Sequence, residues 1–394
     1  MRPPIKHIST GIDVGTHTTR VVIVEQSRGE EPRIIGTGAT ESHGLRHGYI
    51  INKGEASKSI ARAVKIAEKA AGTKINNAIL SVGGISVESL IAHGTTTISR
   101  AGGEIGEQDL RAAIREAEES LPRISNKRVI YSVPLRYKLE GKEVLGTPRG
   151  MIGSKLEVKM LFVTCLEHHL EELMQTIEEL GIEVDEVVPS SIAAGLAALN
   201  KKQRTVGSAL VNIGAETASI AVFENDIPIS LQVFPLGSTD ITNDIAIGLK
   251  ISLEEAEHIK IHNISGDQTE KRTARTKKKL DEIIEARLCD IFELIDAHLK
   301  KIGRSGLLPA GIILTGGGAG ISTIEDIARA ALKLPSSIAH PGTVHASKHT
   351  VKDSSWLVAY GLCLYGLARP KSPTESTLKN ALSAFKKLIK PFLP

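Results

Sequence analysis

Three short segments of this chain carry residue types suited to holding phosphate groups. Glycine leaves backbone N–H groups unobstructed by a Cβ atom, and threonine adds a hydroxyl group, so such turns suit phosphate oxygens. Asp13 stands at a strand end, where a carboxylate can hold Mg²⁺, usually through water because Mg²⁺ dehydrates reluctantly. The candidate residues are Asp13, Gly15, Thr16, His17 and Thr18 in the first segment, Asn212, Gly214, Ala215, Glu216 and Thr217 in the second, and Gly316, Gly317 and Gly318 in the third.

The first two segments are each predicted to form the turn of a strand-turn-strand unit. Apolar, β-branched runs flank the turns within 11–25 and 208–223. The units lie roughly 200 residues apart and each opens one half of the chain, which indicates an internal duplication. The third segment follows a buried strand and precedes a helix, a corner that lets the backbone approach a flat base or a phosphate. Each segment alone is also compatible with an ordinary turn, whereas together they predict two turns facing each other across a cleft.

Hydrophobic periodicity predicts the elements that surround these turns. The block from 84 to 163 has a different character from its flanks, and its β-α-β-β pattern predicts a small inserted subdomain. In chain order we expect a strand at 34–40, a helix at 55–71 ending at Gly72, a strand at 79–82, a strand at 87–99, a helix at 106–120, strands at 128–137 and 156–164, a helix at 168–180, and a helix-rich stretch at 250–303.

Composition narrows the class of protein. The chain has 394 residues and a net charge of only +4, with aromatic residues at 3%. Neither a basic surface nor aromatic stacking platforms are indicated, so no nucleic-acid partner is expected. The three cysteines form no CxxC pair, and no secretory signal or run of about 18 apolar residues occurs. These features favour a cytoplasmic protein.

In their order and spacing, the three segments resemble the two phosphate loops and the adenosine motif of the actin, sugar-kinase and chaperone ATPase superfamily. Glu257 and Lys260 match its "AExIK" helix, whose Glu and Lys flank the ribose and adenine. Further motifs resemble the bacterial cell-division family FtsA, from Ile12 to the C-terminus. The resemblance implies an α/β, actin-like two-domain fold with ATP and Mg²⁺ as ligands. The motifs are Gly44–Gly48, Gly146–Val158, and Ile241–Ala246 followed by Glu254–Glu257.

Three departures from the family pattern affect the expected chemistry. Asn212 stands where the family's second loop has aspartate, and Glu216 stands where it has glycine. Losing one carboxylate and placing another near the phosphates should weaken Mg²⁺ coordination and add repulsion. Thr18 stands where the family often has lysine. We therefore expect ATP binding with slow hydrolysis, at most a weak ATPase.

The C-terminal segment predicts a short amphipathic helix behind a Pro/Ser linker. Its apolar positions fill an arc of about 120°, and lysines occupy the opposite side. At about 14 residues it is roughly 21 Å long, too short to span a bilayer, so we expect it to lie in the plane of an anionic membrane. A terminal helix packed on its own domain or on a partner is the alternative. The membrane residues expected are Leu378, Leu382, Phe385, Lys386, Lys387, Leu388, Ile389 and Phe392.

The domain order expected from these patterns has six parts. They are residues 1–83, the first part of the first actin-like domain; 84–163, the inserted subdomain; 164–204, the rest of the first domain; 205–368, the second domain with a helical subdomain at about 240–305; 369–376, the linker; and 377–394, the amphipathic helix.

The family resemblance also implies partners. It implies a filament-forming adaptor on the cytoplasmic face of the membrane, at the division site, that binds other division proteins and the C-terminal tail of the tubulin-like protein FtsZ. Arg287 matches the family's "IIEPR" helix in the subdomain that receives this tail, although a surface salt bridge would explain the same residue. A pilus-assembly actin homologue of the PilM type, without a membrane helix, is the main alternative. A sugar kinase is a weaker one, because no catalytic Asp and sugar-binding set can be located.

Overall fold

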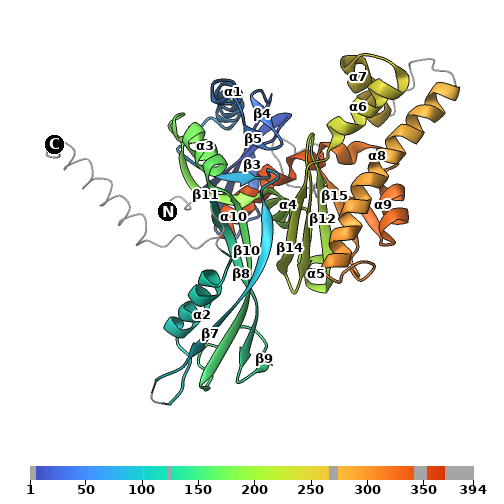
Figure 1. Ribbon diagram of the computed structural model, residues 1–394. Coiled ribbons are helices and arrows are strands. Elements are labelled where there is room, and N and C mark those ends of the chain that lie inside the picture. The colour runs from blue at the N-terminus through green and yellow to red at the C-terminus, as the bar shows by residue number, and fades with distance from the viewer. Residues whose placement is uncertain (1–5, 101, 123–125, 266–273, 341–352, 369–394) are drawn as a thin grey trace.

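The computed structural model describes residues 6–100, 102–122, 126–265, 274–340 and 353–368 (Figure 1). Two large sheets lie beside each other, and a narrower subdomain projects from them. The expected linker at 369–376 and the expected amphipathic helix at 377–394 lie outside the described residues. Within the described ranges, no helix is long and apolar enough to cross a membrane.

The first sheet begins with the predicted strand-turn-strand unit. Strands β1 and β2 pair antiparallel on either side of the first turn, while β1 pairs parallel with β6. Helix α1 (Lys53–Ala71) covers β2 and β3 and begins after the Asn52 cap, two residues before the predicted start. It ends at Gly72 in the left-handed conformation, and this end was predicted. The sheet order is β11 (Glu183–Pro189), β6 (Asn77–Val82), β1 (Lys6–Val14), β2 (Thr18–Ser27) and β3 (Arg33–Glu41).

The second sheet repeats this topology. Strands β12 and β13 pair antiparallel around the second turn, and β12 pairs parallel with β15. The order β14-β13-β12-β15-β16 therefore matches β3-β2-β1-β6-β11 strand for strand, which confirms the duplication inferred from the sequence. The strands are β12 (Ser208–Ile213), β13 (Ala218–Glu224), β14 (Ile227–Phe234), β15 (Ile312–Thr315) and β16 (Ser336–Ile338).

The inserted subdomain extends the second sheet beyond β14. Its strands continue in the order β7-β10-β8-β9, and α2 (Glu107–Glu119) packs on β7 and β10. The expected β-α-β-β pattern gains one short strand, β9, because Glu140 and Gly141 both adopt positive φ and reverse the chain. A separate hydrophobic core, including Leu156, Met160 and Phe162, fills the subdomain. The strands are β7 (Glu88–Thr97), β8 (Lys127–Leu139), β9 (Lys142–Val144) and β10 (Lys155–Leu166).

Two helices pack against each other between the two sheets. Helix α10 (Leu357–Ala368) packs on β1 and β2, α4 (Ser190–Ala198) packs on β12 and β13, and the two helices contact each other. They cross so closely that a Cβ at Gly361 would lie 1.8 Å from the Ala193 carbonyl oxygen. One hydrophobic core therefore continues from the first sheet to the second and is shared by both halves.

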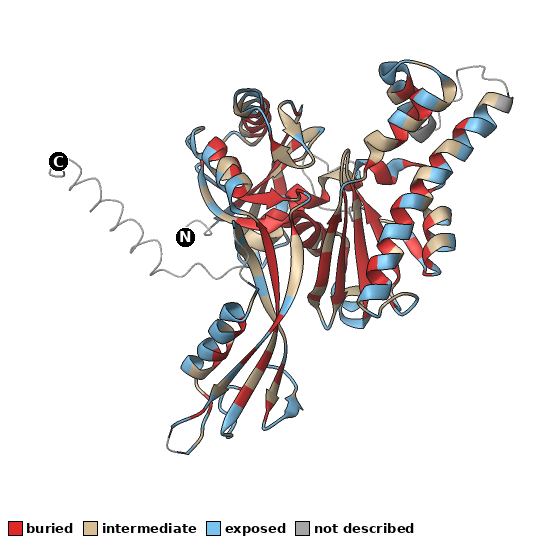
Figure 2. Cartoon of the chain, viewed as in Figure 1, coloured by how far each residue is buried: buried red, intermediate tan, exposed pale blue. Residues whose placement is uncertain are grey.

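The outer face of the second sheet is covered by helices. Leu288, Phe292 and Ile295 of α8 pack with Val211 and Ile220 of the sheet. Buried positions are concentrated in the strands and on the inward faces of helices (Figure 2). The remaining elements are β4 (Leu45–Arg46), β5 (Tyr49–Ile50), α3 (Glu167–Glu178), α5 (Lys201–Val206), α6 (Ser238–Leu249), α7 (Leu253–Ser265), α8 (Ala274–Lys301), α9 (Ile324–Leu332) and the 3₁₀ turns Gly317–Gly320 and Ser354–Trp356.

Candidate nucleotide site

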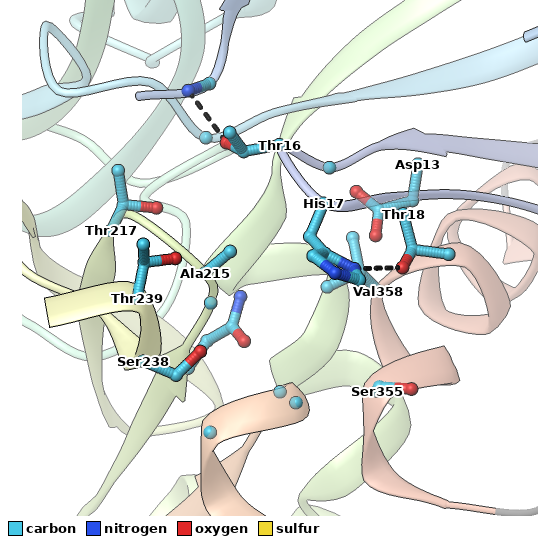
Figure 3. Close-up of a pocket in the computed structure, with 18 of the residues that line it drawn as sticks. Asp13, Thr16, His17, Thr18, Ala215, Thr217, Ser238, Thr239, Ser355 and Val358 are labelled. Atoms are coloured by element: carbon cyan, nitrogen blue, oxygen red, sulfur yellow. Dashed lines mark hydrogen bonds between the residues drawn. The ribbon is translucent and has the colours of Figure 1, made fainter. Parts of the chain in front are cut away.

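The three glycine-containing segments meet at one cleft between the two halves (Figure 3). The duplicated topology explains the meeting, because the turn after β1 and the turn after β12 occupy equivalent ends of the two sheets. The cavity measures about 260 Å³. Among its lining residues are Asp13, Gly15, Thr16, His17, Thr18, Asn212, Gly214, Ala215, Thr217, Glu257, Lys260, Gly316, Gly317 and Gly318.

Asp13 lies at the floor of the cleft beside a buried cation. The Ser81 hydroxyl donates a hydrogen bond of 2.6 Å to its carboxylate, and Arg20 is its cross-strand neighbour on β2. Burial raises the pKa of Asp13, while the bond from Ser81 and the charge of Arg20 oppose that rise. Burial also lowers the pKa of Arg20, although Asp13 and Asp353 favour its charged form. The Nε of Arg20 is buried with no hydrogen-bond partner in the described part of the chain.

The third segment leaves open space beside its backbone. Gly316 has φ of +88°, a conformation that favours glycine, and it turns the chain out of β15. A Cβ built on Gly317 would meet no atom within 4 Å. The backbone at this corner is therefore accessible from the cleft, as the sequence predicted.

Lys260 ties α7 to the beginning of α6 at the cleft wall. Its side chain is buried and donates to the Ser238 carbonyl at 3.0 Å and to the Thr242 hydroxyl at 2.7 Å. It also forms an ion pair of 2.7 Å with Glu257. Burial alone would raise the pKa of Glu257, but the bonds from Lys260 and Thr242 hold it below its usual range. A charged pair is thereby fixed on the second-domain side of the cleft.

Glu216 differs from its expected placement beside the phosphates. It does not line the cavity. Its carboxylate instead accepts a hydrogen bond of 2.5 Å from the backbone N–H of His47, in the first half of the chain. The side chain thus faces the rim, so the repulsion expected from it inside the cleft has no structural basis.

Several lining residues were not identified from the sequence. Ser81 lies within the strand predicted at 79–82, and Ser238 and Thr239 begin the helix that carries one of the motifs, so the sequence offered a signal at both places. Ser355 and Val358 offered none, because only the packing of α10 brings them beneath the first turn. Figure 3 shows Ser238 and Thr239 on one wall of the cleft, with Ser355 and Val358 below the first turn.

Arg287 is not in the cleft and has partners within its own chain. Its guanidinium makes two bonds to Asp244 of α6, from Nε at 2.6 Å and from Nη2 at 3.0 Å. It also lies 3.2 Å from Asp290 on its own helix. The hydrogen bond to Asp244 raises the pKa of Arg287 further. The salt bridge named as the alternative explanation is therefore present.

The residues present fit a nucleotide better than a free metal ion. A buried guanidinium with a free Nε donor, accessible backbone at Gly317, and threonine hydroxyls all suit an anionic ligand with a flat base. No group of three or more His, Cys, Asp or Glu side chains converges among the described residues. One carboxylate, Asp13, suits Mg²⁺ only as a minor ligand alongside water and phosphate oxygens.

Fold and cleft together define an actin-like protein with an inserted subdomain. Similar solved structures show the same fold: the PilM-PilN type IV pilus biogenesis complex has a TM-score of 0.69 at 17% identity, covering 93% of this chain and 100% of that chain. The structure of MreB5 of Spiroplasma citri bound to ADP has a TM-score of 0.52 at 14% identity, covering 96% and 98%.

Sequence comparison names the family. The family model "Cell division protein FtsA" matches residues 209–361, and "SHS2 domain inserted in FTSA" matches residues 84–164. The cell division protein FtsA of Bacillus subtilis is 31% identical over 367 residues, covering 89% of this chain and 81% of the relative. That of Pseudomonas aeruginosa is 27% identical over 376 residues, covering 91% and 89%. The chain belongs to the FtsA family of cell division proteins, and this membership favours the main prediction over the pilus-type alternative.

Proposed function

We propose that this cell division protein binds ATP in the cleft between its two halves. The observation that carries the proposal is the convergence of all three predicted segments, with Glu257 and Lys260, on one cavity. Two solved structures of the same fold, both of MreB5 of Spiroplasma citri, hold ADP and AMPPNP. The proposal extends that kind of ligand to this chain.

Each part of the cleft has a distinct role in this proposal. The turns at 15–18 and 214–217 bind phosphate oxygens through backbone N–H and hydroxyl groups, and Gly316–Gly318 face the adenosine. Asp13 holds Mg²⁺ through water, and the ion would neutralise phosphate charge. Asn212 supplies no second carboxylate on the other side, so hydrolysis is expected to be slow.

Gly317→Leu tests the site directly. The open space beside Gly317 accepts a side chain without a clash, so this variant should fold and fill the volume that the nucleotide needs. Gly54→Leu is the matched control, because a Cβ there meets only Asn52 Oδ1 at 3.6 Å and lies on the exposed start of α1. Calorimetric titration with Mg-ATP should show binding to wild type and control and none to Gly317→Leu. Equal affinity in all three would refute the site.

The proposed function extends to the membrane through the C-terminal segment, on the evidence of its sequence. The apolar positions from Leu378 to Phe392 and the lysines at 386 and 387 favour binding in the plane of an anionic leaflet. This would make the chain a peripheral protein of the cytoplasmic membrane face. There it would polymerise and tether the tubulin-like FtsZ ring, and Arg287 would contribute to binding the FtsZ tail.

Vesicle sedimentation separates the membrane proposal from nucleotide binding. Wild type should sediment with phosphatidylglycerol-containing vesicles at low salt, and less protein should sediment as salt screens the charges. Deletion of residues 377–394 and Phe385→Glu should each abolish sedimentation and leave ATP affinity unchanged. If wild type stays in the supernatant at low salt, with and without ATP, the membrane tether is refuted.

A further inference from the structure

We propose that His47 and Glu216 form a clasp that holds the two halves together at the mouth of the cleft and slows release of the nucleotide. The inference rests on the proposed function, because it assigns positioning residues to that site. Its basis is a contact between the β4–β5 hairpin of the first half and the turn after β12 in the second half. The sequence did not predict this contact.

The hairpin presents two consecutive backbone N–H groups to the two turns. Strands β4 and β5 pair around His47 and Gly48, whose φ angles are +47° and +81°, as a two-residue type I′ turn requires. The N–H of His47 donates to Glu216 Oε2 at 2.5 Å, and the N–H of Gly48 donates to Thr16 Oγ1 at 3.1 Å. One hairpin tip therefore contacts both candidate phosphate-binding turns. Figure 3 shows the bond to Thr16.

A second contact joins the same two residues, and His47 is again the donor because a carbonyl oxygen can only accept. The His47 Nδ1 lies 3.2 Å from the Glu216 carbonyl oxygen, within hydrogen-bonding distance. The side chains of His47 and Glu216 are only 33% and 27% exposed, so both contacts are partly shielded from water. A carboxylate that accepts a backbone N–H forms a charge-assisted bond, which is stronger than a bond between neutral groups.

Both partners are anchored within their own halves, so the contact can transmit force. On the first side, the ring of Tyr49 stacks on His169 of α3 with 3.9 Å between centroids, and its hydroxyl accepts the Ser86 N–H. On the second side, the N–H groups of Ser238 and Thr239, at the start of α6, donate to Gly214 and Ala215 at 2.9 and 2.8 Å. Separating the halves at the rim must break the contact between His47 and Glu216.

The clasp depends on the carboxylate side chain of Glu216. Glycine, which the family resemblance implies at this position, has no side chain that could reach the hairpin. Glu216 is also outside the cavity lining, so removing its carboxylate should leave the groups that face the ligand in place. Removing this carboxylate should therefore change the rate of nucleotide release more than the number of nucleotides bound per chain.

Stopped-flow displacement of a fluorescent ATP analogue from the full chain tests the clasp. Glu216→Ala should release the analogue about tenfold faster, the factor expected for one charge-assisted hydrogen bond. Glu216→Gln keeps an oxygen that can accept the His47 N–H and should recover most of the slow release, which a general loss of stability would not predict. Glu293→Ala, an exposed carboxylate of α8, is the matched control and should release at the wild-type rate.

Hydrogen–deuterium exchange provides a readout that needs no nucleotide. The amide of His47 should exchange faster in Glu216→Ala than in wild type, and at the wild-type rate in Glu293→Ala. Equal release rates and equal His47 exchange in wild type and Glu216→Ala would overturn the clasp. If wild type fails to bind the analogue at all while His47 exchange still differs, the proposed function is refuted and the interdomain contact stands.

Discussion

Acidification should destabilise this protein through His298, a buried histidine of α8. His298 is 8% exposed and lies against the edge of Phe234, with 6.4 Å between ring centroids. Its Nε2 is 2.9 Å from the Ser230 hydroxyl. Burial, with a smaller contribution from the charge of Lys301, lowers the pKa of His298 from 6.5 to about 4. The imidazole is therefore neutral in the folded protein at neutral pH.

The sign of the effect follows from which state binds the proton first. As pH falls below 6.5, His298 of the unfolded chain becomes protonated while that of the folded chain does not, so the free energy of unfolding decreases. The stability is fully present above pH 6.5 and is lost progressively towards pH 4. At 1.36 kcal/mol per pKa unit, the loss attributable to this residue is about 2 kcal/mol at pH 5 and at most about 3.4 kcal/mol below pH 4.

Urea unfolding of wild type and His298→Gln at pH 7.5, 6.0 and 5.0 measures this loss. Other groups titrate in the same range, so the informative quantity is the difference between the two proteins. Wild type should lose about 2 kcal/mol more than His298→Gln between pH 7.5 and 5.0. His93→Gln, an exposed histidine of the inserted subdomain, should follow the wild-type profile. Parallel profiles for wild type and His298→Gln would refute the reasoning.

Three further substitutions test the cleft and the helical subdomain. Lys260→Met removes bonds to Ser238, Thr242 and Glu257; it should lower the free energy of unfolding by about 2–3 kcal/mol and weaken ATP binding, as thermal unfolding and titration would show. Arg287→Glu places a carboxylate beside Asp244 and should lower the free energy of unfolding by about 1–2 kcal/mol. It should also weaken binding of an FtsZ tail peptide without changing ATP affinity. Unchanged peptide affinity would mean that Arg287 serves only the salt bridge. Asn212→Asp should leave ATP turnover equal or raise it, whereas a wild-type turnover within about 1–10³ per second would contradict slow hydrolysis.

Much of the candidate site could be predicted from local sequence. Asp13 lies near the end of β1, and Gly15 and Thr16 lie between two apolar strands. Short-range patterning of that kind specifies a turn without help from the rest of the chain. The same holds for the end of α1 at Gly72, which was predicted from that one helix alone. The order and spacing of the three segments indicated the fold class through the family resemblance. In the structure, each half of the duplicated fold places its turn at the same end of its sheet, so the two turns meet.

The surroundings of the site could not be predicted in the same way, because they depend on contacts between residues far apart in the chain. His47 and Glu216 are 169 positions apart, and nothing in either local pattern directs one to the other. Arg20 reads as an ordinary strand residue, and only the packing of α10 and Trp356 over β2 buries its guanidinium beside Asp13. Local patterning therefore determined which turns could bind a phosphate. Only the tertiary structure decided which charged groups are buried beside these turns and which side chains connect the two halves of the chain. Burial and the distance between the two halves depend on how the whole chain folds.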